Sequence, residues 1–180
     1  MSDLERKLLN SELIFTGNII NLRVDTLALP SGVQTTREVV EHRGAVAIVP
    51  MNGMEVILVR QPRHAVGQSL LEIPAGKLEG EENPEERAKR ELLEETGFVA
   101  GQMEKLFSCY STPGFSNELL HIYLAADLTY EAPDPDFDEE IEVVTMPLEE
   151  AVGLVWSGGI QDAKSIAGLL AAAWIAIHSE

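Results

Sequence analysis

Five glutamates between positions 85 and 95 have a spacing that suits metal chemistry. On a helix, Glu91 and Glu95 would lie one above the other, and like charges so placed are destabilising unless something neutralises them. Arg87 and Arg90 neutralise part of this charge, and Arg90 can pair with Glu94 four residues on. A bound Mg²⁺ would neutralise more of the charge, because it binds oxygen ligands and often uses one or two carboxylates together with substrate phosphates. A run of charged residues alone more often forms a solvated helix face. The surrounding residues must therefore decide between such a face and a metal site.

The segment that carries these carboxylates has start and stop signals of a helix. Asn83 suits the N-cap, Pro84 suits the first helical position, and Glu86 lies where it would complete a capping box. Gly97 suits the residue that ends the helix. We therefore predict a helix over residues 84–96.

The rest of the chain is predicted to form short strands and two closing helices. The strand segments are rich in β-branched and aromatic residues and lie between turn signals. They are 12–16, 19–27, 34–41, 45–49, 55–60, 70–73, 105–110, 121–126 and 142–146. Helices are expected over 147–156 and 162–177, and a glycine-rich loop over 75–80. Strands with one central and two terminal helices predict an α+β fold or a mixed α/β sandwich.

Composition and charge exclude several classes of protein. With 180 residues, 45% apolar and 24% charged, the chain suits one compact domain rather than a fibrous or disordered protein. Thirteen Lys and Arg against thirty Asp and Glu give a formal charge of −17. This charge disfavours nucleic acid and anionic membranes as partners. It still permits a small phosphorylated ligand, because bound metal ions reverse the local sign of a carboxylate cluster.

Cysteine content and hydropathy bear on location. The single cysteine, Cys109, allows no intrachain disulfide and no multi-cysteine metal site. The first residues lack the basic and apolar regions of a signal peptide, and the uncharged stretch 165–178 is too short to span a bilayer. These features predict a soluble, cytoplasmic protein.

The residues around the carboxylate helix form a longer pattern. Gly76 is followed by five spacers and Glu82, and then by seven spacers and the run Arg90-Glu91-Leu92-Leu93-Glu94-Glu95-Thr96-Gly97-Phe98. This pattern resembles the Nudix box at every defining position. Membership of the Nudix hydrolase superfamily implies an α/β/α sandwich with a mixed β-sheet. It also implies hydrolysis of a nucleoside diphosphate linked to another group.

The resemblance assigns roles within the box. Glu91 and Glu95 are implied as the main metal ligands, with the carbonyl of Ala75 and the carboxylate of Glu94 completing the site. Arg90 is implied to orient the glutamates. The implied ion is Mg²⁺, with Mn²⁺ and Zn²⁺ as alternatives. Such ions neutralise diphosphate oxygens and lower the pKa of a bound water.

Residues after the box reduce the number of candidate substrates. Pro113, sixteen residues beyond Gly97, is similar to the marker of the ADP-ribose pyrophosphatase branch, and so are the segments 73–76 and 139–144. The resemblance implies hydrolysis of ADP-ribose to AMP and ribose 5-phosphate, with a nucleotide sugar such as GDP-mannose as the close alternative. A nucleotide-sensing module that does not cleave its ligand, and a hydrolase of damaged nucleoside triphosphates, are weaker alternatives.

The general base is expected in the acidic segment 131–142, which holds seven acids in twelve residues. Such a composition usually marks only a solvated loop, but it also suits a lid that closes over substrate. In the branch that this chain resembles, the base comes from a loop after the box. That resemblance favours Glu139, followed by Glu140 and Glu142.

Arginines are expected to bind the substrate phosphates. Arg60 and Arg63 end a strand and can offer bidentate guanidinium contacts. Arg37 is similar to a position that reaches the partner's site in dimers of the branch, although a surface ion pair is an equal alternative. Glu118, in the loop with Pro113, can accept a hydrogen bond from a ribose hydroxyl.

Two regions follow from this organisation. Residues 1–42 form a small antiparallel strand arm that is too thin to stand alone, and the resemblance implies its exchange across a homodimer. Residues 43–180 form the Nudix hydrolase domain. The expected ligand is a small nucleoside diphosphate.

Overall fold

The computed structural model describes residues 6–132 and 140–178. The chain forms two compact units. The first comprises residues 1–44 and 110–119, and the second comprises residues 45–109 and 120–180. No helix among the described residues is long and apolar enough to cross a membrane.

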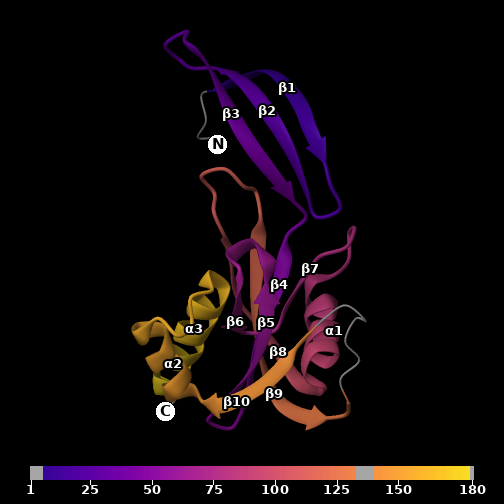
Figure 1. The fold of residues 1–180 in the computed structure, drawn as a ribbon, viewed down its shortest axis with the longest axis vertical. Helices are drawn as coiled ribbons and strands as arrows, with labels where there is room; N and C mark the ends of the chain where they lie inside the picture. The colour runs from indigo at the N-terminus through magenta and orange to yellow at the C-terminus, as the bar shows by residue number, and fades with distance from the viewer. Residues whose placement is uncertain (1–5, 133–139, 179–180) are drawn as a thin grey trace. The chain divides into compact units, whose positions relative to one another are not determined.

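The first unit is a three-stranded antiparallel sheet in the order β1-β2-β3 (Figure 1). Its strands are β1 (Lys7–Thr16), β2 (Ile20–Ala28) and β3 (Gln34–His42). The loop 111–118 runs along the end of β3, where the Val40 N–H donates to the Phe115 carbonyl at 2.8 Å. The expected strand arm is therefore present, and this loop packs with it.

The second unit is built on a mixed sheet in the order β10-β5-β4-β9-β8, with β6 paired to β5 and β7 paired to β4. Strand β4 runs parallel to β9 and antiparallel to β5 and β7. A short 3₁₀ helix, η1 (His64–Val66), joins β5 to β6. The strands are β4 (Ala45–Asn52), β5 (Glu55–Arg63), β6 (Gln68–Glu72), β7 (Ala75–Lys77), β8 (Phe98–Tyr110), β9 (Leu119–Tyr130) and β10 (Glu142–Pro147).

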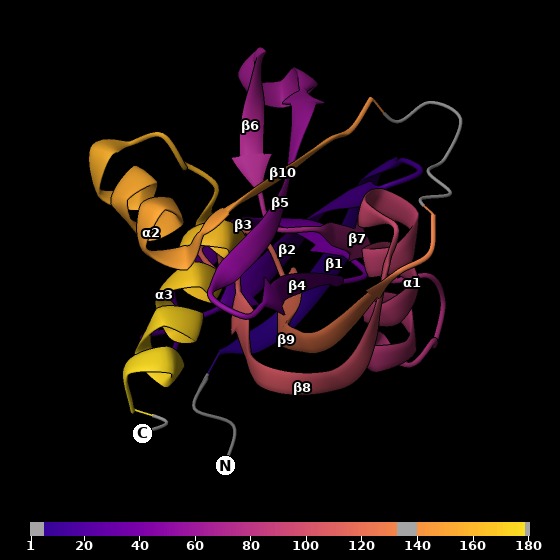
Figure 2. The same ribbon diagram turned by 90° about the horizontal axis from the view of Figure 1, so that it is seen from below.

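In the described part of the chain, helices cover the two faces of this sheet: α1 (Pro84–Thr96) lies on one face, and α2 (Leu148–Ser157) and α3 (Ala163–His178) lie on the other (Figures 1 and 2). Alternate residues of β4 supply the two cores. Val46 and Ile48 pack with α1, whereas Ala47 and Val49 pack with α2 and α3. Burial on both faces explains why this strand is an unbroken apolar run. The expected α/β/α sandwich with a mixed sheet is confirmed.

Local details differ from the sequence expectations. The predicted helix 84–96 is confirmed, with Asn83 Oδ1 accepting from the Glu85 N–H at 2.8 Å and Gly97 at φ 75°. The Glu86 carboxylate accepts from Lys89 rather than closing a capping box. The expected loop 75–80 begins with β7, and β8 starts at residue 98 rather than 105. Strand β7 pairs with β4, which is distant in the sequence, whereas β8 pairs with β9, the next strand along the chain.

Candidate active site

Helix α1 buries two carboxylates on the side that it packs against the sheet. Glu91 is 5% exposed and Glu95 is 3% exposed, together with Ala88 and Leu92 of the same helix. The spacing of four residues stacks the two glutamates on one face, as the sequence predicts. Charged side chains are rarely buried without partners. The groups around Glu91 and Glu95 therefore indicate which ligand the site can bind.

Glu91 lies directly against the backbone of β7. A Cβ placed on Gly76 would lie 1.5 Å from Glu91 Oε1 and 1.9 Å from its Cδ, so a side chain at this position cannot coexist with the glutamate as placed. The same Oε1 forms an ion pair with Arg87 Nη2. The box glycine is therefore a packing requirement, since only glycine lets the carboxylate approach the strand.

Glu95 is held by the backbone of the same strand. Its Oε2 accepts a hydrogen bond from the Ala75 N–H at 3.0 Å. The preceding residue is fixed to β4, because the Pro74 carbonyl accepts from the Ile48 N–H at 2.9 Å. Residues 74–76 thus connect the central sheet to both glutamates.

Arg87 lies among the carboxylates of the box. Burial alone would lower the pKa of its guanidinium, but the charges of Glu91, Glu94 and Glu82, with the Glu91 hydrogen bond, raise that pKa above its ordinary value. Arg87 is not among the site residues predicted from the sequence, although its spacing of four residues from Glu91 is the signal that could have identified it.

Arg90 has a different partner from the one that helix spacing suggests. Its Nη2 forms an ion pair with Glu82 Oε2 rather than with Glu94. This contact joins the loop before α1 to the helix, and the Glu79 N–H donates to the other Glu82 oxygen at 2.6 Å. Arg90 therefore anchors the loop that contains Glu82 to α1. Its role in orienting Glu91 and Glu95 remains a prediction.

The oxygen donors of this site suit a hard divalent ion whose coordination would be completed by water and substrate. Among the described residues, no three His, Cys, Asp or Glu side chains converge into a ready-made metal cluster. Mg²⁺ does not require one, because it commonly binds one or two protein carboxylates with water and substrate phosphates. Glu91 and Glu95 supply two buried carboxylates, and the glycine cradle at position 76 keeps space for one of them.

Arg63 extends the site along the sheet. Residues alternate between the faces of β5, and Val56 and Leu58 face α2 and α3, so Arg63 lies on the α1 side. Its Nε and Nη2 donate to Glu72 Oε1 and Oε2 at 2.9 and 2.8 Å. Glu72 was not expected as a site residue, and its partners are too distant in the sequence for spacing to reveal it.

Arg60 and Glu142, both sequence candidates, are brought together. They are opposite each other on β5 and β10, and Arg60 Nε lies 3.2 Å from Glu142 Oε2. Alternation along β5 places Arg60 on the face opposite to Arg63. Both partners are exposed, so this pair contributes little to stability. Glu140 is also exposed, and Glu139 lies outside the described residues.

The remaining candidates belong to the first unit. Arg37 Nη1 donates to Thr35 Oγ1 at 2.9 Å and to the Thr36 carbonyl at 2.7 Å. Pro113 is exposed in the loop that packs along β3. Glu118 closes that loop, because its Oε2 accepts from Ser111 Oγ at 2.5 Å and its Oε1 lies 3.5 Å from His42 Nδ1.

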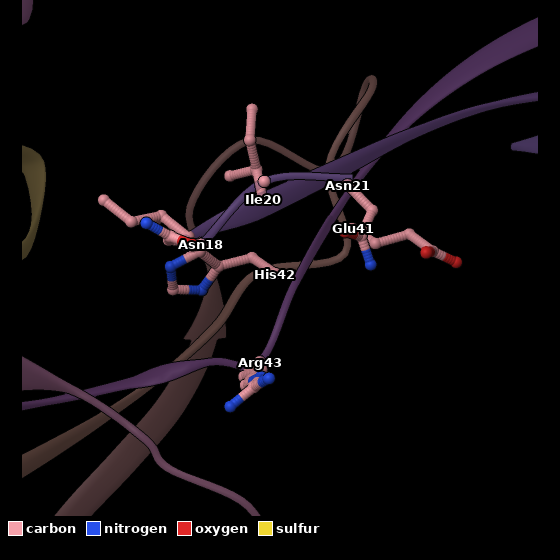
Figure 3. Close-up of a pocket in the computed structure, with 8 residues that line it drawn as sticks. Asn18, Ile20, Asn21, Glu41, His42 and Arg43 are labelled. Carbon is pink, nitrogen blue, oxygen red and sulfur yellow. The ribbon is translucent and has the colours of Figure 1, made fainter. Parts of the chain in front are cut away.

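The first unit also contains a small pocket of about 130 Å³ (Figure 3). It is lined by Gly17, Asn18, Ile19, Ile20, Asn21, Glu41, His42 and Arg43. Sites for small molecules usually measure roughly 300–1,000 Å³, so this pocket is too small for a whole nucleoside diphosphate.

Comparisons with known proteins found a matching family model, similar sequences and a similar solved structure. A family model described as the NUDIX domain matches residues 41–169. An ADP-ribose pyrophosphatase of Bacillus subtilis is 42% identical over 92% of this chain and 91% of its own length. A GDP-mannose pyrophosphatase of Yersinia enterocolitica is 35% identical over 76% of each chain. A crystal structure of an ADP compounds hydrolase superposes with a TM-score of 0.85, at 25% identity, over 98% of this chain and 97% of that one.

Proposed function

This chain belongs to the Nudix family of hydrolases, and from that premise we propose that it hydrolyses the diphosphate bond of ADP-ribose, giving AMP and ribose 5-phosphate. The observation that carries the proposal is the burial of Glu91 and Glu95 against residues 75 and 76. Two carboxylates held in this way suit a metal-assisted attack of water on a diphosphate. The 42% identity to an ADP-ribose pyrophosphatase supports the choice of substrate.

Mg²⁺ is the proposed ion, held by Glu91 and Glu95 with the Ala75 carbonyl and Glu94. When bound, it would neutralise diphosphate oxygens and lower the pKa of a bound water. Arg63, with its guanidinium on the same side of the sheet, would bind a phosphate of the substrate. The general base is proposed among Glu139, Glu140 and Glu142, with Glu139 preferred.

A homodimer is proposed for the assembly. Strand β1 is exposed along its whole length, and the large apolar side chains Leu8, Leu13 and Phe15 are each more than half exposed. A thin sheet that leaves such residues uncovered is a natural surface for a second copy of the chain. Arg37, on β3 of the same sheet, would then serve the partner's site.

A cytoplasmic location is proposed from the cysteine content. The only cysteine of the chain, Cys109, is half-buried in β8 beside the core, so the fold uses no intrachain disulfide. That usage suits a reducing compartment.

The test is a hydrolysis assay with ADP-ribose, GDP-mannose, ADP-glucose, coenzyme A and NADH, each with Mg²⁺ and with EDTA. Metal-dependent release of AMP that is fastest from ADP-ribose is the expected result. Faster hydrolysis of GDP-mannose would keep the chemistry and overturn the substrate. Binding of these nucleotides without cleavage would favour a nucleotide-sensing module.

Single substitutions test whether α1 carries the active site. Glu91→Gln and Glu95→Gln should each lower kcat by at least about 100-fold, since even groups behind metal ligands contribute about 10- to 100-fold. Glu149→Gln is the matched control, because Glu149 is an exposed glutamate in the first turn of α2. Equal activity of all three variants would contradict the assignment of the site to α1.

A further inference from the structure

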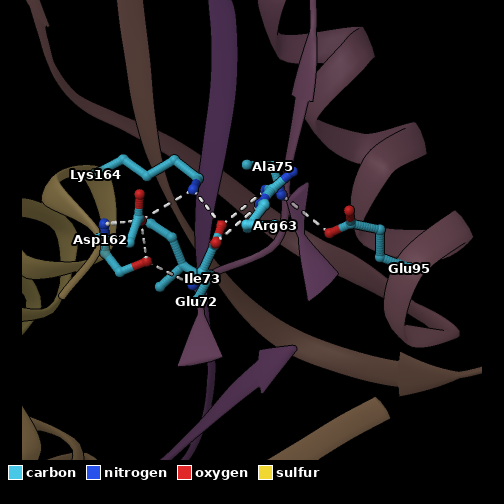
Figure 4. Close-up of polar contacts among 8 residues, drawn as sticks. Arg63, Glu72, Ile73, Ala75, Glu95, Asp162 and Lys164 are labelled. Carbon is cyan, nitrogen blue, oxygen red and sulfur yellow. Dashed lines mark hydrogen bonds and ion pairs between the residues drawn. The ribbon is translucent and has the colours of Figure 1, made fainter. Parts of the chain in front are cut away.

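A second charged cluster links β5 and β6 to the C-terminal helix (Figure 4). Its centre is Glu72, the last residue of β6, which is 1% exposed. Both of its carboxylate oxygens accept from Arg63, and Oε2 also accepts from Lys164 Nζ in the first turn of α3. Lys164 Nζ lies 2.9 Å from Asp162 Oδ2 as well.

Two cations keep this buried carboxylate ionised. Burial raises the pKa of Glu72, but the hydrogen bonds and charges of Arg63 and Lys164 outweigh it and hold that pKa below its ordinary value. Without Lys164, Oε2 would keep Arg63 Nη2 as its partner but lose its second cation, and the carboxylate would be held less firmly. Lys164 is therefore part of what fixes the position of Glu72.

The orientation of Arg63 depends in turn on Glu72. A guanidinium bound through two parallel N–H···O contacts is fixed in its plane as well as in its position. The contact with Glu72 uses Nε and Nη2 and does not involve Nη1. The Glu95 charge reaches Arg63, because it adds to the Glu72 hydrogen bond and charge in raising the Arg63 pKa against the effect of burial. Arg63 thus lies between Glu72 and the box.

We propose that Lys164 is a positioning residue: it fixes Glu72 so that Glu72 presents the remaining N–H groups of Arg63 to the diphosphate of the substrate. The inference rests on the proposed function for the identity of that substrate. It assigns the C-terminal helix, which supplies none of the box residues, a role in substrate binding.

The same turn of α3 offers a matched control. Ser165 Oγ accepts from the Ile73 N–H at 2.9 Å and donates to Asp162 Oδ2 at 2.5 Å. Ser165 is fully buried, so Ser165→Ala should destabilise the protein without removing a charge from Glu72. A variant at Ser165 therefore reports what general damage to this turn does to activity.

The kinetic test compares Lys164→Met, Lys164→Arg and Ser165→Ala, with ADP-ribose as substrate at saturating Mg²⁺. Lys164→Met should raise KM by about 5- to 10-fold and leave kcat within about twofold, because a loosened Arg63 weakens substrate and transition state alike. Lys164→Arg should restore KM. Ser165→Ala should lower Tm and leave KM unchanged. An unchanged KM in Lys164→Met, or an equal rise in Ser165→Ala, would overturn the proposal.

A second measurement requires no substrate. The Arg63 Nε–H, bound to a buried carboxylate, should exchange slowly with solvent in an NMR experiment on the wild-type protein, and Lys164→Met should accelerate that exchange while Ser165→Ala does not. Unchanged exchange in Lys164→Met would refute the link from Lys164 to Arg63. If the wild type cleaves no nucleotide, the proposed function and the diphosphate as ligand both fail. The exchange data would then still test whether Lys164 fixes the position of Arg63 through Glu72.

Discussion

Replacing Gly76 by alanine tests whether the glycine of the box is there to admit Glu91. The new Cβ would lie 1.5 Å from Glu91 Oε1, whereas ordinary contact begins near 3.4 Å, so the carboxylate must move by about 2 Å. Glu91 is 5% exposed and paired with Arg87, which leaves it little free space for that movement. Overpacking of this kind typically costs about 1–3 kcal/mol of stability.

The consequence for activity should exceed the consequence for folding. Metal–ligand distances must lie within about 0.2 Å of their ideal values, so a carboxylate displaced by about 2 Å no longer serves as a ligand. We expect Gly76→Ala to fold with a lower Tm, to need much more Mg²⁺ for half-maximal activity, and to lose at least about 100-fold in kcat/KM. AMP release from ADP-ribose over an Mg²⁺ titration, together with thermal unfolding, measures all three.

Gly153→Ala is the matched control. Gly153 lies inside α2, where an added Cβ meets nothing within 4 Å. This variant should keep full activity and gain up to about 1 kcal/mol, because alanine is the better helix former. If Gly76→Ala retained wild-type activity and Mg²⁺ dependence, the argument that this glycine makes room for a metal-binding Glu91 would be refuted.

Three further outcomes are expected. Glu139→Gln should lower kcat by about 100-fold with unchanged Mg²⁺ affinity, and near wild-type turnover would transfer the role of base to another acid of its segment. Glu72→Gln should cost about 3 kcal/mol at neutral pH by leaving two cations without their carboxylate. The folded pKa of Glu72 is depressed, so its contribution is complete above the unfolded pKa of about 4.3 and is lost as pH falls through the folded value. Urea unfolding of wild type and variant should therefore converge in acid, and a constant difference down to pH 2 would contradict this. Leu13→Glu should yield monomers by light scattering, whereas Met54→Glu, an exposed apolar position of the second unit, should not; dimers in both would argue against the arm as the interface.

Local rules recovered much of the fold from the sequence. Helix α1 was predicted at its observed bounds because its cap, its proline and its terminal glycine all lie within one short segment. Most strands were recognised from apolar runs between turns. The expectation failed where pairing rather than composition makes the strand: β7 has only three residues and exists because β4 lies beside it.

The sequence by itself determined the family and the two carboxylates, because the spacing of Gly76, Glu91 and Glu95 is a property of one continuous segment. Only the tertiary structure decided their partners. It placed Glu91 in contact with Gly76, joined Glu95 to the Ala75 amide, and gave Arg90 to Glu82. It also brought Glu72 to Lys164, 92 residues away. Spacing predicts contacts along a helix, where geometry repeats every few residues, whereas contacts between elements depend on how the sheet and helices pack.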